Sequence, residues 1–195
     1  MIPSHRLKRA KRALRREVLA LRDALPQADR VERSRRIADR LLALPELAEV
    51  RTVMAFSSFG SEVDTAPILE RLAERGVRLA LPRILDDEVV PVTYRPGEPV
   101  TEAAFGALEP TAGEVLSSTE VDVVVTPGVA FDRGGFRVGY GGAYYDRFFR
   151  GARVEMFRVA VGFAVQVVEE VPHGLGDLPM DALVTEDEVT RCPRT

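Results

Sequence analysis

The sequence is poor in the residues that carry nucleophilic or redox chemistry. It contains one cysteine, two histidines and no tryptophan among 195 residues. The single Cys192 cannot form an internal disulfide, which suits a reducing cytoplasm, and we expect it in a frayed C-terminal tail. No Ser/His/Asp or Cys/His set is apparent. No apolar run is long enough to span a membrane, and the first residues lack the apolar core of a signal peptide. We therefore expect a cytoplasmic protein without a membrane partner.

Lysine is also scarce, and the charges are unevenly distributed. Only Lys8 and Lys11 are lysines, and the other 25 basic residues are arginines. Residues 1–40 carry a net charge of +8 and the remainder −11, which gives −3 overall. A basic N-terminal segment can bind nucleic acid or a small polyanion. Because acidic residues dominate the rest and no nucleic-acid motif appears, we expect no nucleic-acid partner. Nucleic-acid binding through the basic N-terminal helices remains the second alternative function.

The length and composition suit one globular domain, residues 1–195, that acts as a monomer. The order of apolar runs predicts an α/β fold in three layers, with a mixed, mainly parallel sheet and helices on both faces. A helical pair, residues 1–44, should pack on this core. The first helix runs from Ser4 to about Leu25 and the second from about Gln27 to Leu44. Their inward stripes are expected to be Leu7, Leu14, Val18, Leu21 and Leu25, and then Val31, Ile37, Ala38, Leu41 and Leu42.

Short apolar runs predict the strands. They cover residues 52–56, 78–82, 89–94, 121–125 and 158–163, and residues 165–168 could extend the last one. Asp64 or Thr65 should start a helix that ends near Arg75, before Gly76. Residues 86–88 read as an acidic hairpin turn, and residues 95–119 as irregular.

The stretch from residue 121 to 149 carries the clearest chemical signal. A buried strand, Val121–Val125, leads through a loop to Arg137, a glycine-rich turn at 139–142 and a helix at 143–150. Ligands of open α/β sheets lie beyond the carboxyl ends of the strands. Glycines let the backbone approach a ligand closely, and a helix N-terminus favours an anion. A phosphate is the expected ligand, with Arg137 as a bidentate cation and Asp146 near a bridging metal.

The spacing alone does not identify a known nucleotide motif. A Walker A loop is absent, and Tyr144 stands where a dinucleotide fingerprint has its third glycine. The glycines could therefore form a phosphate cradle or only a tight strand-to-helix turn.

Longer matches favour the phosphate cradle. The segments PGVAFD and GGFRVGYGGAYYDRFF resemble the signature of the 5-formyltetrahydrofolate cyclo-ligases, and AKRALR resembles that family's N-terminal nucleotide-binding segment. The resemblance extends over the full length. It implies ATP- and Mg²⁺-dependent conversion of 5-formyltetrahydrofolate to 5,10-methenyltetrahydrofolate, with release of ADP and phosphate. The formyl oxygen would be phosphorylated and N10 would then close the ring.

The resemblance also assigns roles to individual residues. It implies catalytic roles for Arg137 and Lys11. The implied ATP contacts are Lys11, Arg12, Leu14, Arg15, Arg137, Val138, Gly139, Tyr140, Gly141, Gly142, Ala143, Tyr144 and Tyr145. The implied folate contacts are Glu62, Tyr140, Gly141, Gly142 and Tyr144, and the implied metal ligands are Asp146 and Asp181. Arg83 is a secondary candidate for the same crevice.

Four positions depart from the family pattern. Tyr140 and Gly142 stand where some relatives carry basic residues, Ala143 replaces a frequent glycine, and Gly176 replaces a frequent histidine. If position 143 needs a positive φ, alanine there costs about 1 kcal/mol. These departures motivate the first alternative, a related protein that binds folate or nucleotide without closing the ring or with altered specificity.

Overall fold

The computed structural model describes residues 4–103 and 106–193. The helices are α1 Ser4–Asp23, α2 Gln27–Leu42, η1 Pro45–Leu47, α3 Ala66–Glu74, η3 Ser118–Glu120, α4 Tyr144–Arg150 and η4 Ala164–Gln166. The strands are β1 Thr52–Met54, β2 Arg78–Leu85, β3 Glu88–Thr93, β4 Val100–Glu102, β5 Leu108–Pro110, β6 Val123–Thr126, β7 Ala130–Phe131, β8 Arg137–Val138, β9 Phe157–Val161, β10 Ala182–Val184 and β11 Val189–Arg191. In both described stretches every helix is too short or too polar to span a bilayer.

Seven strands form the main sheet, in the order β11-β10-β9-β6-β1-β2-β3. The five inner strands are mutually parallel, and the edge strands β3 and β11 run antiparallel to their neighbours. Parallel strands are buried on both faces, so they read as the continuous apolar runs seen in the sequence. The expected mixed, mainly parallel sheet is confirmed.

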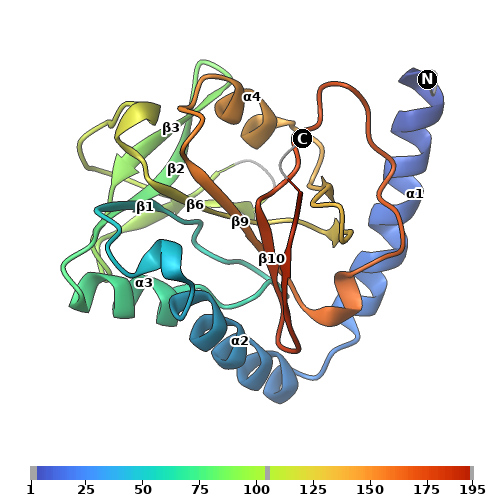
Figure 1. Cartoon of the computed structure of the whole chain (residues 1–195), viewed down its shortest axis with the longest axis horizontal. Helices are drawn as coiled ribbons and strands as arrows, with labels where there is room; N and C mark the ends of the chain where they lie inside the picture. The colour runs from blue at the N-terminus through green and yellow to red at the C-terminus, as the bar shows by residue number, and fades with distance from the viewer. Residues whose placement is uncertain (1–3, 104–105, 194–195) are drawn as a thin grey trace.

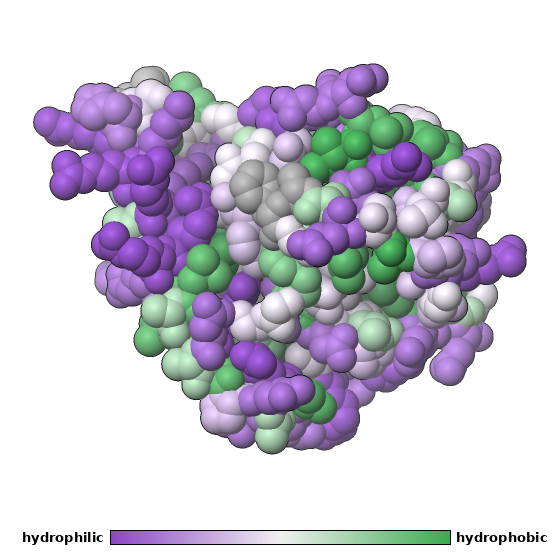
Figure 2. Space-filling view, turned by 180° about the vertical axis from the view of Figure 1, so that it is seen from behind, coloured by the Kyte–Doolittle hydropathy of each residue, from purple (hydrophilic) through white to green (hydrophobic). Residues whose placement is uncertain are grey.

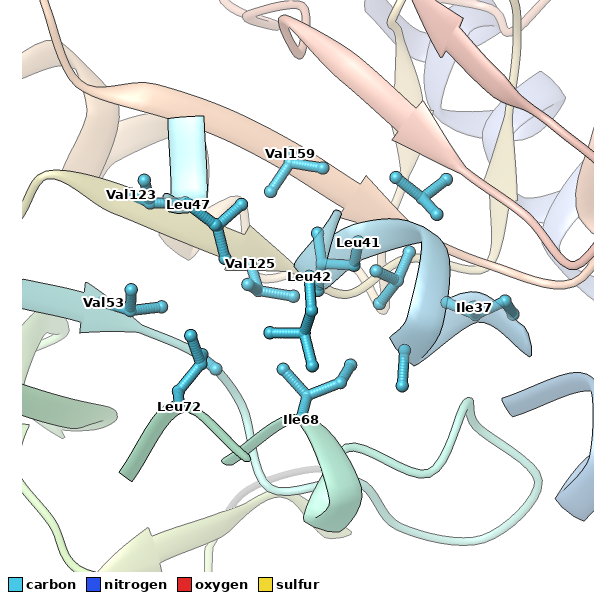
Figure 3. Packing of buried hydrophobic residues seen from close by; sticks show 14 of the residues in the cluster. Ile37, Leu41, Leu42, Leu47, Val53, Ile68, Leu72, Val123, Val125 and Val159 are labelled. Carbon is cyan, nitrogen blue, oxygen red and sulfur yellow. The ribbon is translucent and has the colours of Figure 1, made fainter. Parts of the chain in front are cut away.

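Helices cover both faces of this sheet (Figure 1). Side chains alternate along each strand, so Val53 of β1 points to one core cluster and Met54 to the other. The first cluster joins the sheet to α2 and α3, as the close-up of Ile37, Leu41 and Ile68 shows (Figure 3). The second cluster joins the other face to α4. The three-layer prediction is therefore correct.

The two N-terminal helices occupy different places (Figure 1). Helix α2 contacts α3 and β10, whereas α1 lies apart, against η4 and β7. Val18 of α1 packs in a third cluster with Val129, Val138 and Val171. Helix α1 is thereby held beside the segment that carries the glycine turn.

Two predicted apolar stripes are partly wrong. Leu21 of α1 is 52% exposed, while the adjacent Arg22 is 3% exposed, and Val31 of α2 is 60% exposed. Ile37, Ala38, Leu41 and Leu42 are buried as predicted. On α2 the apolar periodicity predicts the buried face correctly except at Val31, near the start of the helix. On α1 the polar Arg22 is buried where the apolar Leu21 was expected.

Two predictions near the C-terminus are also corrected. Residues 164–166 form the 3₁₀ turn η4 rather than an extension of β9. The buried Gln166 side chain accepts a hydrogen bond from the Phe163 N–H and donates to the carbonyls of Gly128 and Val129. These side-chain bonds satisfy main-chain groups that strand pairing would otherwise have to satisfy. Cys192 is 8% exposed rather than frayed, and its N–H donates to the Asp181 carbonyl at 2.9 Å.

Phe131 fixes the packing beneath the glycine turn, and its removal tests this core. The ring is 1% exposed, and a Cβ added at Gly128 or Gly162 would lie 2.6 or 2.5 Å from it. We expect Phe131→Ala to lower the unfolding free energy by about 3–5 kcal/mol because it leaves a cavity. Denaturant unfolding measures this. Val154→Ala, at an 84% exposed position, should change stability by less than about 0.5 kcal/mol, and an equal effect of both variants would contradict this packing.

Candidate functional site

The cavity that contains the predicted site lies where the strand order of the main sheet reverses, between β1 and β6. From β1 the chain passes through α3 to β2 on one side, and from β6 it passes through α4 to β9 on the other. Such a reversal leaves a crevice beyond the carboxyl ends of the two strands. A cavity of about 590 Å³ occupies it, with Phe56 after β1 and Pro127 after β6 in its wall.

The residues to which the resemblance assigns a role meet in this cavity, with two exceptions, and the secondary candidate Arg83 also lies outside it. Leu14 and Asp181 do not line it. The predicted residues that do are Lys11, Arg12, Arg15, Glu62, Arg137, Val138, Gly139, Tyr140, Gly141, Gly142, Ala143, Tyr144, Tyr145 and Asp146. Arg83 is not in the wall, although its neighbours Pro82 and Ile84 are, because successive side chains of a strand point to opposite faces.

The glycine turn brings the main chain to the cavity wall. Gly141 has a φ of 119°, which other residues rarely adopt. A Cβ added at Gly142 would lie 2.2 Å from the Tyr144 ring, so only glycine fits there without a shift. Ala143 starts α4 with a φ of 53°, so the expected strain at this position is present.

The strain at Ala143 predicts a stabilising substitution. We expect Ala143→Gly to raise the unfolding free energy by about 0.5–1 kcal/mol, because the relief of the left-handed backbone exceeds the added entropy of the unfolded chain. Ala10→Gly, in the exposed middle of α1, should lower it by a similar amount. Thermal unfolding of both variants measures the two signs, and destabilisation by Ala143→Gly would contradict the backbone assignment.

Arg137 is the most deeply buried cation of the cavity wall. Its side chain is 6% exposed, and Nη2 donates to Asp146 Oδ1 at 3.2 Å while Nη1 donates to the Leu178 carbonyl at 3.2 Å. The guanidinium also lies 6.0 Å from the ring centre of Tyr145 and 5.5 Å from that of Phe149. Burial lowers the pKa of Arg137, and Asp146 acts in the opposite direction. Arginine nevertheless stays charged, so the cavity has a fixed cation at its base.

Helix α1 adds further cations beside the glycine turn. Arg15 donates from Nε to the Gly139 carbonyl at 2.7 Å, and Lys11 pairs with Asp177 at 2.5 Å. Burial and, less strongly, Arg12 lower the pKa of Arg15. Within the described ranges Lys8 and Arg12 have no hydrogen-bond or ion-pair partner, although both line the cavity. Hydrophilic side chains gather on the side of the molecule that carries α1 (Figure 2). Because Lys8 and Arg12 are cationic and line the cavity, its mouth favours an anion.

The opposite wall carries a buried carboxylate and an aromatic pair. Glu62 is 8% exposed, and its oxygens accept from the Tyr140 hydroxyl at 2.9 Å and the Phe59 N–H at 3.1 Å. The Phe59 and Tyr140 ring centres lie 5.4 Å apart. Burial raises the pKa of Glu62, and these two hydrogen bonds lower it. Burial and then Glu62 raise the pKa of Tyr140, so its hydroxyl remains a proton donor. This wall suits a flat ring with an N–H edge.

The two predicted residues outside the cavity have other surroundings. Leu14 packs against the third apolar cluster on the side of α1 that faces Val129. Asp181 stands just before β10, and its carboxylate accepts from the Arg158 N–H at 2.7 Å and the Arg158 guanidinium at 3.4 Å. Asp177, four residues earlier, lines the cavity instead. No group of three His, Cys, Asp or Glu in the described part of the chain could by itself hold a metal.

Some residues of the site were not predicted. Arg147 donates to the carbonyls of Gly142 and Asp87, both at 2.8 Å, and lies 4.8 Å from the Tyr144 ring centre. It ties the tip of the β2–β3 hairpin to the glycine turn. Phe59 could have been noted from its place in the loop after β1, but the sequence gives no signal for the link between α4 and the hairpin.

Comparison with known proteins identifies the family of this chain. The model of the 5-formyltetrahydrofolate cyclo-ligase family matches residues 7–186. The 5-formyltetrahydrofolate cyclo-ligase of Escherichia coli (strain K12) is 33% identical over 175 residues, which cover 86% of this chain and 96% of the relative. That of Mycolicibacterium smegmatis is 32% identical over 185 residues, which cover 91% and 94%. The NMR structure of Aquifex aeolicus 5,10-methenyltetrahydrofolate synthetase has a TM-score of 0.83 at 32% identity and covers 95% of this chain and 94% of that one. The chain therefore belongs to the 5-formyltetrahydrofolate cyclo-ligase family.

Proposed function

We propose that this protein converts 5-formyltetrahydrofolate to 5,10-methenyltetrahydrofolate with consumption of ATP and release of ADP and phosphate. The observation that carries the proposal is one cavity whose wall has two unlike parts. A glycine turn with Arg137, Lys11 and Arg15 forms one part of the wall, and Glu62 with Phe59 forms another. Tyr140 of the turn joins the two parts, because its hydroxyl donates to Glu62 and its ring lies beside Phe59. The first part suits a triphosphate and the second a pterin ring.

The nucleotide phosphates would lie on the glycine turn. Main-chain N–H groups of residues 139–143 would donate to phosphate oxygens, because no side chain at Gly141 or Gly142 obstructs them. Arg137 and Arg15 would neutralise charge from within the cavity, and Lys11 would exchange its bond with Asp177 for a phosphate. Arg12 and Lys8 at the mouth would attract the polyanion.

The folate would lie against the opposite wall. The Glu62 carboxylate accepts hydrogen bonds only, so it complements an edge of the pterin that presents N–H and NH₂ donors. Tyr140, Gly141, Gly142 and Tyr144 also line the cavity and would contact both substrates at the reacting groups.

The donors fit Mg²⁺ that arrives with ATP. Mg²⁺ usually takes one or two protein carboxylates, with phosphate oxygens and water completing its shell. Asp146 in the cavity wall would be its protein ligand, with Asp177 nearby. Asp181 would instead serve to hold Arg158, given its hydrogen bonds. When bound, Mg²⁺ neutralises charge that develops on the phosphates.

The chemistry needs alignment rather than a side-chain nucleophile. The formyl oxygen attacks the γ-phosphorus and ADP departs. N10 then attacks the activated formyl carbon and loses its proton, and phosphate leaves with the former formyl oxygen. Arg137, buried at the base of the glycine turn, is placed to stabilise the phosphoryl group during transfer. The proposal includes a cytoplasmic location and a monomer, and the lining residues that it uses all come from one chain.

The test is formation of the methenyl product, followed by its near-ultraviolet absorbance. Protein, 5-formyltetrahydrofolate and Mg²⁺ should give product only when ATP is added, with equal amounts of ADP and phosphate.

The strained backbone at Ala143 (φ 53°) favours a second candidate function, that of a protein that binds folate or nucleotide without ring closure. Binding of either ligand without product would favour that candidate, and binding of neither would overturn both.

A further inference from the structure

One buried charge near the cavity has no place in the function described so far. Arg22 lies in the last turn of α1 and is 3% exposed. It follows Lys11 and Arg15 by eleven and seven residues, close to whole helical turns, so the three side chains share one side of α1. Unlike the other two, Arg22 does not line the cavity.

Arg22 reaches Glu62 through one intermediate. Its Nε donates to Ser61 Oγ at 2.9 Å, and its Nη2 donates to the Tyr140 oxygen at 3.1 Å. Tyr140 in turn donates to Glu62 Oε1 at 2.9 Å. A guanidinium can only donate, so the single Tyr140 proton must go to the carboxylate. The polarity of the chain from Arg22 through Tyr140 to Glu62 is therefore fixed.

The charges show why this link matters. Among the described residues no carboxylate pairs directly with Arg22, and its buried Nη1 has no partner. Asp23 is reached only through Ser61. The charge of Arg22 is thus available to favour the ionised form of Glu62. The other ionisable groups near Glu62 are Tyr145 and, across a second cavity of about 220 Å³, Arg30 and Asp64.

We propose that Arg22 is a positioning residue for folate binding, which acts through Tyr140 to hold Glu62 in place as an ionised acceptor. This rests on the proposed function, in which Glu62 binds the pterin edge. Arg22 touches neither substrate in this account. Its effect should therefore appear mainly in folate binding and depend on the Tyr140 hydroxyl, while the main chain of the glycine turn, which would hold the phosphates, keeps its conformation.

A double-mutant cycle on the full chain tests the proposal. We expect Arg22→Met and Tyr140→Phe each to raise KM for 5-formyltetrahydrofolate about tenfold, the size of one charge-assisted hydrogen bond. In the double variant the folate KM should also rise about tenfold rather than about a hundredfold, because both substitutions remove the same Arg22–Tyr140–Glu62 connection. KM for ATP should not change in Arg22→Met, and Arg22→Lys should recover part of the loss.

A pH profile separates positioning from general damage. Without the Arg22 charge the pKa of Glu62 rises further, so the acid limb of kcat/KM should move to higher pH in Arg22→Met. A folded Arg22→Met variant with a wild-type folate KM and a wild-type pH profile would overturn the proposal. A folate KM raised about a hundredfold in the double variant would overturn it as well. If Arg22→Met does not fold, the Tyr140→Phe variant decides, and a wild-type folate KM in that variant would overturn the proposal. An active wild type in any of these cases leaves the proposed function standing, whereas a wild type that binds no folate overturns both.

Discussion

Replacement of Arg137 by alanine is expected to lower kcat about 10²–10³-fold, the usual effect of removing one fixed group that stabilises transition-state charge. The guanidinium is held at the base of the glycine turn by Asp146, the Leu178 carbonyl and two rings, so its charge is fixed in one place before the reaction. Arg137→Lys keeps the positive charge but lacks the bidentate guanidinium, so its kcat should lie between those of the wild type and Arg137→Ala. Steady-state turnover, normalised to folded protein, measures the effect.

Arg158→Ala is the matched control for this variant. Arg158 lies 5.8 Å from the centre of the same Phe149 ring and pairs with the buried Asp181, but it does not line the cavity. Both alanine variants should lose stability, because each removes a hydrogen-bonded guanidinium from a buried or half-buried carboxylate. Only Arg137→Ala should lose turnover per folded molecule. Equal losses from both variants would mean that Arg137 serves the fold alone.

Glu62→Gln should raise KM for 5-formyltetrahydrofolate by about 10- to 100-fold, because a neutral amide offers one acceptor where the carboxylate offers two. KM for ATP should change little, since the proposed phosphate contacts are the glycine turn, Arg137 and the cations of α1. Glu74→Gln, at an exposed position at the end of α3, should leave both constants unchanged. An unaltered folate KM in Glu62→Gln would show that the pterin lies elsewhere.

The same variant should alter how stability depends on pH. Burial raises the pKa of Glu62 above its ordinary value of 4.5, so the native state holds a proton that the unfolded chain releases. Between pH 4.5 and the raised native pKa, the wild-type unfolding free energy should fall as pH rises through this group. Glutamine does not titrate, so the stability of Glu62→Gln relative to wild type should increase over this window. Urea unfolding at several pH values measures it, and a constant difference would contradict the raised pKa.

Much of the fold follows from local sequence pattern. The inner strands are short β-branched runs buried on both faces, such as residues 123–125, and their alternation with helices predicts a parallel sheet. The glycine turn is also readable, because positions such as Gly141 need conformations that few residues adopt. Both signals are local, so they can be read from the sequence without knowing which residues contact each other in the fold.

The parts that depend on distant partners were harder to predict. Arg22 is buried and Leu21 exposed because the partners of α1 at that turn are polar, Ser61 and Tyr140, and lie far along the chain. Apolar periodicity assumes that the buried face is apolar. Cys192 looked like part of a free tail because its cover, the Asp181 carbonyl and the Gly135 backbone, comes from other segments. In each case the missing information is a tertiary contact.

The fate of the formyl oxygen tests the central claim most directly. 5-Formyltetrahydrofolate labelled with heavy oxygen in the formyl group should be converted with ATP and Mg²⁺, and the released phosphate analysed by mass spectrometry. Transfer of the γ-phosphoryl group to the formyl oxygen predicts that the label appears in phosphate, one atom for each methenyl product. Label in water, with unlabelled phosphate, would contradict phosphorylation of the formyl group in this cavity.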